Sequence, residues 1–292
     1  MEVTGSIFTL ERPAFVAVLG VFGLCIGSFL NVLVHRLPRM LERQWQGECQ
    51  LLLGLPTAAP QPRYDLLLPH SHCPHCKQPI AFYDNIPVLS WCLLGGRCRR
   101  CEAPISRRYP LVELATAMLC AFCGWHFGVG WQAAGACVLS VGLLALALID
   151  LDTQLLPDTL TQPLLWLGLM VNAGGLFVLL PSALAGAVAG YLCLWSVYWI
   201  FRGLTGKEGM GQGDFKLLAL LGAWLGWKAL PLILFGASLV GAIVGIALMV
   251  LTGRGRHEPL PFGPFLAAAG WLALVWGEPL TRAWLGLLGE GV

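Results

Sequence analysis

The stretch Gly211-Gln212-Gly213-Asp214-Phe215-Lys216 decides how the chain is organised, because it places an acid directly before the apolar run Leu217–Trp227. A charged side chain near the middle of a bilayer costs roughly 2.5–3.5 kcal/mol, and such a group therefore suggests a function. The two glycines allow open backbone angles and close approach by another chain. We expect a carboxylate beside a peptide-binding backbone at a membrane edge. The alternative is that Asp214 only caps a helix.

The composition of the 292-residue chain is that of a protein with many membrane spans. Hydrophobic residues make up 57% of it, charged residues make up 12%, and the mean hydropathy is +0.72. Soluble domains carry about 25% charged residues. Ten of the eighteen Lys and Arg residues lie between Arg36 and Arg108. Positive charge beside membrane spans explains this block, so we expect no nucleic-acid partner.

Apolar runs predict an all-α polytopic membrane protein with about eight transmembrane helices. Each run is compatible with the ~20 residues that a spanning helix needs. We expect no cleavable signal peptide, because the N-terminus has Glu2 and no basic segment. The predicted spans are approximately 13–34, 113–130, 131–149, 159–180, 182–201, 215–232, 233–251 and 262–277.

The spans divide the chain into three predicted regions. Residues 1–36 hold the first transmembrane helix, 37–110 form a small cytoplasmic zinc-ribbon-like domain, and 111–292 form a membrane domain of seven helices. Within the insert, residues 46–70 have no clear period, and we expect them to form a loop.

Basic residues set the predicted orientation, because loops rich in Lys and Arg stay in the cytoplasm. The loop at 202–216 carries such residues, as does the loop at 253–258 with Arg254 and Arg256. The short loops at 127–131 and 180–182 carry none. The insert, the end of the third span and the start of the sixth therefore face the cytoplasm.

This topology brings Asp150 to the same membrane face as Asp214. Two carboxylates that lie close together cannot both ionise cheaply, so one proton is shared. Aspartic-protease chemistry needs one ionised carboxyl to activate water and one protonated carboxyl to donate to the scissile carbonyl. Asp152 and Asp158 compete for the role of partner. We favour Asp150, which continues its span directly, whereas Asp158 follows Pro157 and resembles a helix N-cap.

Two CxxC motifs, Cys73-Pro74-His75-Cys76 and Cys98-Arg99-Arg100-Cys101, predict a metal site. The 21 residues between them are close to the spacing of zinc ribbons. Four thiolates make a closed, structural zinc site, and a reducing cytoplasm disfavours the alternatives of disulfides or a redox motif. His72, His75 and Cys92 are substitute ligands that would break the Cys₄ pattern. We expect Zn²⁺ to be held by Cys73, Cys76, Cys98 and Cys101.

The chain resembles the bacterial type IV prepilin peptidases, which are membrane aspartyl proteases with a GxGD signature. The resemblance runs from about residue 20 to 270. Besides Gly211–Lys216 and the two CxxC motifs, it rests on Gly27–Val32 with Arg36–Pro38, Asn85–Pro87, Arg108–Glu113, Ile149–Asp152 with Leu156–Asp158, and Pro261–Pro264.

The resemblance implies a bifunctional enzyme of the bacterial inner membrane, with its active site and zinc domain facing the cytoplasm. Such an enzyme cleaves the basic leader of type IV prepilins and pseudopilins after a glycine, for pili or type II secretion. It then methylates the new N-terminal residue, usually phenylalanine, using S-adenosylmethionine. In the family the catalytic pair corresponds to Asp150 and Asp214. The partners implied are these substrates and the lipid bilayer.

The same resemblance places methylation determinants at Gly96 and Arg97. Arginine replaces the family's lysine here, and guanidinium and ammonium groups bond differently. A tight turn at Gly95-Gly96 is an equally good interpretation. Glu113 is either a paired structural acid or part of the cofactor site. No GxGxxG motif of a Rossmann-type methyltransferase is present.

Three other functions compete with this interpretation. A membrane aspartyl protease could act on other membrane-anchored substrates. A proton-coupled transporter could use the paired aspartates as a relay, but it gives no role to the zinc insert. A membrane scaffold with a zinc-ribbon module would leave two costly acids without a function.

Overall fold

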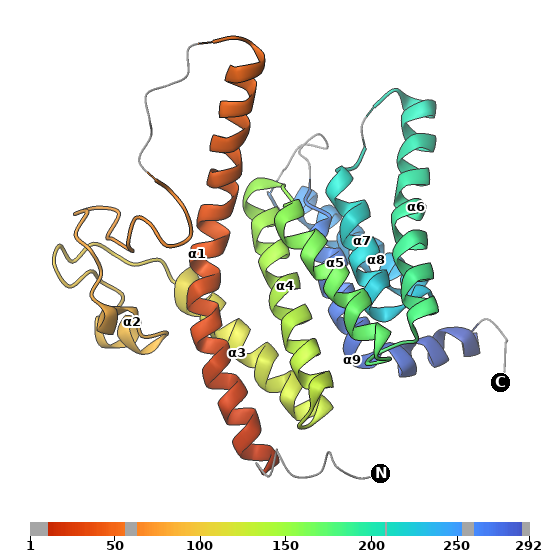
Figure 1. The fold of residues 1–292 in the computed structure, drawn as a ribbon, viewed down its shortest axis with the longest axis horizontal. Coiled ribbons are helices and arrows are strands. Elements are labelled where there is room, and N and C mark those ends of the chain that lie inside the picture. The colour runs from red at the N-terminus through yellow and green to blue at the C-terminus, as the bar shows by residue number, and fades with distance from the viewer. Residues whose placement is uncertain (1–10, 56–62, 208, 253–259, 288–292) are drawn as a thin grey trace. The chain divides into compact units, whose positions relative to one another are not determined.

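The computed structural model describes residues 11–55, 63–207, 209–252 and 260–287, and these are largely helical (Figure 1). The described part contains no strand, only two isolated bridges, His72–Pro79 and Arg97–Pro104. The prediction of an all-α protein is therefore confirmed. The chain forms two compact units, Met1–Val129 and Gly130–Val292. Glu2, Arg254 and Arg256, which entered the predicted topology, lie outside the described residues.

The first unit is built on two long helices, α1 (Arg12–Leu52) and α3 (Arg108–Phe127). Glycines lie where their backbones touch. A Cβ added at Gly27 would lie only 2.6 Å from the Cα of Glu113, and Gly23 is comparably close to α3. Small residues of this kind let helices pack closely within a bilayer. Between the two helices the insert contains the 3₁₀ turn η1 (Phe82–Asn85) and the short helix α2 (Leu89–Leu93).

Helix α1 continues well beyond the predicted first span. It passes through the buried Pro38 and ends at Leu52, so the prediction of a loop from residue 46 was wrong for residues 46–52. Proline lacks an N–H and usually ends or kinks a helix. The residues after Pro38 include Met, Leu, Glu, Arg and Gln, whose high helix propensity favours continuation of the helix.

The second unit is a bundle of helices (Figure 1). Its helices are α4 (Trp131–Thr153), α5 (Asp158–Ala173), α6 (Leu180–Thr205), α7 (Gln212–Leu225), α8 (Leu230–Thr252) and α9 (Gly263–Leu287), with the 3₁₀ turn η2 (Trp227–Ala229) before α8. Helix α9 is kinked at Trp276, and its last part runs across the end of the bundle in Figure 1.

Helix α7 is the core of this unit. It packs against α5, α6 and α9, and every residue from Asp214 to Trp224 except Lys216 is buried. Its contact with α6 is made by backbone atoms, because a Cβ added at Gly222 would lie 2.1 Å from the carbonyl oxygen of Gly186. The close approach of the two backbones fixes the position of the helix that carries Asp214.

Asn172 closes the far end of α7. This buried side chain donates from Nδ2 to the carbonyl oxygens of Ala223 and Trp224 at 2.9 and 3.0 Å. Its Oδ1 accepts the N–H groups of Phe177 and Val178 at 3.0 and 3.1 Å. The last carbonyls of a helix have no partner within the helix, so Asn172 supplies what the end of α7 lacks.

Each of the eight predicted spans coincides with one of the helices α1 and α3 to α9. Five segments are long and apolar enough to cross a bilayer, namely α1, α3, α4, α6 and Trp227–Leu251. The apolar part of α9, Gly263–Gly277, is shorter, and α5 and α7 have only 16 and 14 residues. The spans predicted to reach residues 180 and 232 therefore end earlier, at Ala173 and Leu225.

Candidate functional site

Asp150 lies near the end of α4 and is only 5% exposed. Its Oδ2 accepts a hydrogen bond of 3.0 Å from the backbone N–H of Gly263, the first residue of α9. The first N–H groups of a helix lack partners within the helix and are natural donors to an anion. A Cβ at position 263 would lie 2.6 Å from the same oxygen. Glycine is therefore the residue that leaves room for this carboxylate.

Asp214 lies in the first turn of α7 and is 7% exposed. Gly211 occupies the N-cap position and no side chain caps the helix, so the interpretation of Asp214 as an N-cap was wrong. Asp214 instead experiences the charge of Asp150, which places the two carboxyl groups near each other. The structure therefore brings together the pair of acids that we favoured from the sequence.

Leu156, in the turn between α4 and α5, packs against the first residues of both α7 and α9. A Cβ on Gly213 would lie 2.7 Å from the Cβ of Leu156, and a Cβ on Gly263 would lie 3.4 Å from its Cδ1. The two glycines thus lie against one side chain although they come from different helices. The site consists of the end of α4, the turn that follows, and the first residues of α7 and α9.

The two competing acids lie outside this buried pair. Asp152 and Asp158 are both exposed. Asp158 is the first residue of α5, not its N-cap, so that prediction was wrong. Both of its carboxylate oxygens accept from Nζ of Lys216 at 2.7 Å. This ion pair joins the first residue of α5 to the beginning of α7, two residues after Asp214.

The four predicted metal ligands form one cluster. The Sγ atoms of Cys73, Cys76, Cys98 and Cys101 all lie within 4.8 Å of one another. The Sγ atoms of Cys73 and Cys101 are 3.7 Å apart, close to the ~3.8 Å edge of a tetrahedron with 2.3 Å metal–sulfur bonds. The N–H groups of Cys76 and His75 lower the pKa of the Cys73 thiol to about 6, which favours the thiolate that a metal needs. His72, His75 and Cys92 are not part of the cluster.

The Gly95-Gly96 turn precedes the second CxxC motif. Both glycines have positive φ, +59° and +69°, which strongly favours glycine. A Cβ on Gly96 would also lie 2.9 Å from the ring of Trp91. The fold therefore accounts for Gly96 as a turn residue. Arg97, directly after it, is exposed.

Glu113 holds a strained turn of the insert against α3. Its Oε2 accepts the backbone N–H of Val88 at 2.7 Å, and the Ser28 hydroxyl of α1 also bonds this buried carboxylate. Val88 has φ +59° and ψ −49°, which costs a β-branched residue about 1–3 kcal/mol. Val88 has no feature in the sequence that marks it as part of the site. In the structure Val88 is recognised by its positive φ and by the hydrogen bond from its N–H to the buried carboxylate of Glu113.

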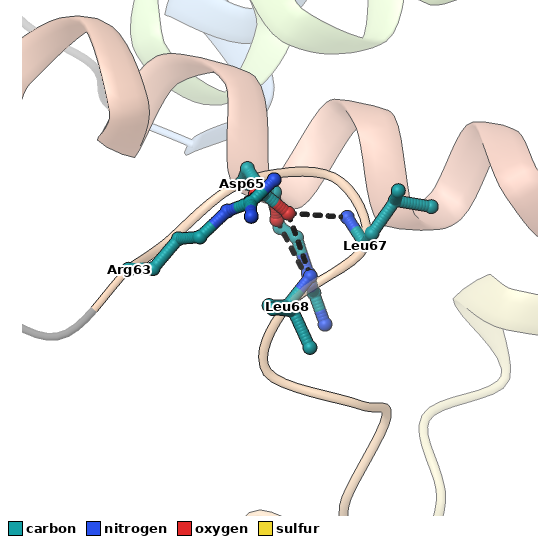
Figure 2. Close-up of polar contacts among 5 residues, drawn as sticks. Arg63, Asp65, Leu67 and Leu68 are labelled. Atoms are coloured by element: carbon teal, nitrogen blue, oxygen red, sulfur yellow. Dashed lines mark hydrogen bonds and ion pairs between the residues drawn. The ribbon is translucent and has the colours of Figure 1, made fainter.

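Arg36 holds a second loop of the insert, shown in part in Figure 2. Its buried guanidinium donates to the carbonyl oxygens of Asp65 and Pro69 at 2.9 and 2.6 Å. The carboxylate of Asp65 closes the loop by accepting the N–H groups of Leu67 and Leu68, and these bonds lower its pKa (Figure 2). In the sequence Arg36 is one of the basic residues beside the first span and part of a family motif, and in the structure it also anchors this loop.

Comparison with known proteins agrees with these observations. Residues 21–127 match the model of the bacterial peptidase A24 N-terminal domain, and residues 137–246 match the model of the type IV leader peptidase family. No solved structure matches the chain.

Several curated relatives are similar over nearly their whole length, and each is a prepilin leader peptidase/N-methyltransferase. The relative from Pseudomonas aeruginosa is 55% identical over 276 residues, which cover 94% of this chain and 95% of the relative. The one from Stutzerimonas stutzeri is 54% identical, with 95% and 96% covered, and the one from Aeromonas hydrophila is 57% identical, with 90% and 91% covered. Two buried acids at the ends of apolar helices, a four-cysteine cluster and identity at this level all agree, and the chain belongs to the type IV leader peptidase family.

Proposed function

We propose that this chain cleaves the basic leader of type IV prepilins and pseudopilins and then methylates the new N-terminal residue. The observation that supports the first reaction best is the pair Asp150 and Asp214. Both are nearly buried, they interact electrostatically, and each lies at the end of a helix in the membrane domain. Buried, neighbouring carboxyl groups that share one proton are the machinery of aspartic proteases.

We assign complementary roles to the two acids. Oδ2 of Asp150 already accepts the N–H of Gly263, which favours an ionised carboxylate there. Asp150 is then the base that takes a proton from the attacking water. Asp214 holds the shared proton and donates it to the oxygen of the scissile carbonyl as the tetrahedral intermediate forms. When the intermediate collapses, Asp150 gives the proton that it took from water to the leaving amine, and Asp214 regains a proton from a hydroxyl of the intermediate, so that the pair returns to its starting state.

The position of the site suits a membrane-anchored substrate. A prepilin presents an apolar helix to the bilayer with its cleavage site at the cytoplasmic edge. Gly211, directly before α7, has extended backbone angles and no side chain, and a Cβ there would meet only Oδ2 of Asp214, at 3.9 Å. An extended substrate segment can therefore lie beside the dyad, as peptides do along an open backbone. We place the protein in the bacterial inner membrane, with this site and the insert facing the cytoplasm, because basic residues surround them.

The cysteine cluster fits zinc by its donor set and its dimensions. Four thiolates about 3.8 Å apart suit a tetrahedral ion, and such a closed site is structural. We propose that Cys73, Cys76, Cys98 and Cys101 hold Zn²⁺ and thereby order an insert that has little apolar core of its own.

S-adenosylmethionine would supply the methyl group for the second reaction. We propose that Gly96 and Arg97 contact it. Arg97 is exposed beside the glycine turn, and a guanidinium suits the carboxylate of the cofactor's methionine part. Within this reaction the chain's own task is to hold the newly formed amine uncharged and close to the cofactor.

Cleavage of a prepilin with a basic leader and a glycine before the cut tests the proposal. Asp150→Asn and Asp214→Asn should each abolish cleavage while bound zinc and methylation of an already cleaved pilin persist. Asp152→Asn is the matched control and should retain cleavage. If Asp152→Asn abolishes cleavage and Asp150→Asn does not, the assignment of the partner is wrong. Cleavage should also continue without S-adenosylmethionine, since the two reactions are chemically independent.

A further inference from the structure

The segment Phe82–Leu93, which comprises η1 and α2, exposes an apolar surface that neither proposed reaction uses. Its most exposed large side chains are those of Phe82 (87%) and Leu93 (77%), and Ile86 and Leu89 are exposed as well. Leu89 and Leu93 are four residues apart and therefore lie on the same face of α2. A cluster of exposed apolar side chains marks an interaction site. We refer to Phe82–Leu93 as the apolar segment.

The apolar segment presents almost no charge of its own. Asp84 is its one charged residue, and the guanidinium of Arg99 neutralises it. Nε of Arg99 lies 2.9 and 3.1 Å from the two carboxylate oxygens, and its NH2 group lies 2.5 Å from Oδ1. The Asp84 side chain is only 12% exposed. The paired acid leaves the apolar side chains as the main feature of this surface.

A single hydrogen bond fixes the depth of the apolar segment along α3. The N–H of Val88 donates to Oε2 of Glu113 at 2.7 Å. Helix α3 is one of the segments apolar enough to span a bilayer, and it begins at Arg108. Glu113 lies five residues later, about 7.5 Å further along the helix axis. In Figure 1, α2 accordingly lies beside the first turns of α3 and not beyond them.

This depth is that of the boundary between lipid headgroups and acyl chains. Interfacial amphipathic segments bury their apolar face about 5–10 Å into this region. On α3 itself the exposed side chains from this level to Trp125 are apolar, namely Leu111, Leu114, Met118 and Trp125. The apolar segment thus continues a surface that a membrane-spanning helix presents to lipid.

Basic residues lie around the apolar segment on the chain. Lys77, Arg100 and Arg107 are all exposed and lie before or after it. Each Lys or Arg near an anionic membrane surface contributes about 1 kcal/mol of attraction. Apolar side chains with a basic surround are the pattern of segments that lie in the interface of an anionic leaflet.

Two hydrogen bonds to other parts of the first unit also fix the orientation of the apolar segment. Val88 keeps a positive φ because its N–H points to Glu113. Trp91 donates from Nε1 to the carbonyl oxygen of Ile105 at 3.3 Å, which ties α2 to the chain just before α3. These contacts hold Leu89 and Leu93 in place without any partner protein.

We propose that the apolar segment Phe82–Leu93 lies in the headgroup–acyl boundary of an anionic leaflet and anchors the insert to the bilayer surface. The ligand is the lipid bilayer. The inference depends on α3 spanning the membrane and does not depend on the proposed catalytic roles. Its consequence is that the cysteine cluster is held at the membrane surface, not free in the cytoplasm.

Depth measurement by electron paramagnetic resonance tests this directly. A ketone-bearing amino acid placed at Phe82 or Leu93 takes a spin label and leaves all native cysteines intact. The full chain is reconstituted in vesicles of phosphatidylethanolamine and phosphatidylglycerol. Collision with oxygen, which partitions into lipid, is compared with collision with a water-soluble nickel chelate. Labels at Phe82 and Leu93 should give an oxygen-to-nickel ratio several-fold above that of a label at Leu52.

Two reference positions calibrate the measurement. A label at Met118 on α3, which is 65% exposed, reports the lipid environment. A label at Leu52, which is 87% exposed at the end of α1 and about 24 Å beyond Arg36 along the helix, reports water. Unchanged zinc content shows that each labelled protein is folded. Adding Leu93→Asp to the Phe82-labelled protein should lower its ratio toward that of Leu52.

If water, the substrate or a second copy of the chain covers the apolar segment in place of lipid, the oxygen-to-nickel ratios will differ from those expected. Ratios at Phe82 and Leu93 equal to that at Leu52 would overturn the proposal. Protection that develops only after prepilin is added would overturn it too and would assign the surface to the substrate. Protection that requires a protein concentration at which the chain dimerises would assign it to a second copy. Asp150→Asn should leave all the ratios unchanged, which separates this test from that of the proposed protease.

Discussion

The backbone N–H of Gly263 donates to Oδ2 of Asp150 at 3.0 Å and joins two residues that are 113 positions apart in the sequence. The bond places the start of α9 against the end of α4 at the proposed active site. It provides a hydrogen bond to a buried carboxylate without introducing another side chain. The absence of a side chain at position 263 therefore allows this hydrogen bond, because the carboxylate of Asp150 occupies the space that a Cβ would fill.

Replacement of Gly263 by alanine should impair cleavage strongly. The new Cβ would lie 2.6 Å from Oδ2 of Asp150, so the carboxylate or the start of α9 must move. A displacement of about 1 Å at reacting groups costs roughly 10²-fold in rate. We expect kcat for prepilin cleavage to fall by about that factor, with KM little changed, in steady-state assays.

Gly236→Ala in α8 is the control for this substitution. Its nearest neighbour would be the Cβ of Ala269 at 3.7 Å, an ordinary contact, so cleavage should persist. Methylation of an already cleaved pilin should persist in both variants. A Gly263→Ala enzyme with the wild-type kcat would show that the contact does not position Asp150.

The ion pair between Asp158 and Lys216 should contribute to stability and little to chemistry. Its groups are partly exposed, with 57% of the Asp158 side chain and 29% of the Lys216 side chain accessible. Pairs of this kind contribute about 0.2–1 kcal/mol. Asp158→Asn should therefore leave cleavage within a few-fold of wild type. A double-mutant cycle with Lys216→Met, read by thermal unfolding, should give a coupling in that range, and loss of cleavage in Asp158→Asn would contradict the prediction.

Removal of one cysteine from the cluster should release the metal. Cys73→Ser and Cys98→Ser each leave three thiolates, and we expect both proteins to lose bound zinc in elemental analysis and to unfold at a lower temperature. Methylation should fall with the metal content, because the insert loses its order. Cys92→Ser lies outside the cluster and should keep its zinc. Unchanged zinc content in both cluster variants would exclude the assignment.

Loss of Asn172 should destabilise the membrane domain. The side chain makes four hydrogen bonds in a site that is 1% exposed, and Asn172→Ala leaves several buried backbone groups without partners. Each such group costs about 1–3 kcal/mol, so we expect a loss of about 3 kcal/mol in unfolding experiments. Gln132→Ala removes one exposed hydrogen bond, to Leu176, and should cost about 1 kcal/mol or less. Equal effects of the two substitutions would refute this role of Asn172.

The pairing of Asp150 with Asp214 could be predicted from sequence because a bilayer simplifies the problem. Apolar runs of fixed length alternate between two faces, and the distribution of basic residues assigns those faces. Two acids at the ends of spans on one face are then candidates for contact. The four cysteines were predictable for a similar reason, since the spacing within a CxxC motif is local. Catalysis by the two acids remains a prediction.

Other parts of the site depend on contacts that no local pattern encodes. Asp158 resembles an N-cap when only Pro157 is considered, but its partner Lys216 comes from α7. Glu113 stands out in the sequence as an acid at the start of an apolar run. Its role as a hydrogen-bond acceptor, however, depends on the N–H of Val88, which comes from the insert. The apolar run marks the end of the first span near residue 34, but it does not show how far the helix continues beyond the membrane, through Pro38 to Leu52.

The shortness of α7 has a consequence for the medium in which the enzyme works. Fourteen residues rise about 21 Å, whereas the hydrocarbon core of a bilayer is ~30 Å thick. Trp227 and Lys228 follow directly, and residues of these types prefer the membrane–water interface. In an undeformed bilayer with that end at one boundary, Asp214 would lie about 10 Å below the opposite boundary, so the bilayer must thin locally for the dyad to reach the cytoplasmic edge. The acyl-chain length of the host lipid therefore sets how far water must travel to reach the dyad, and bilayer thickness becomes a variable of the hydrolysis rate.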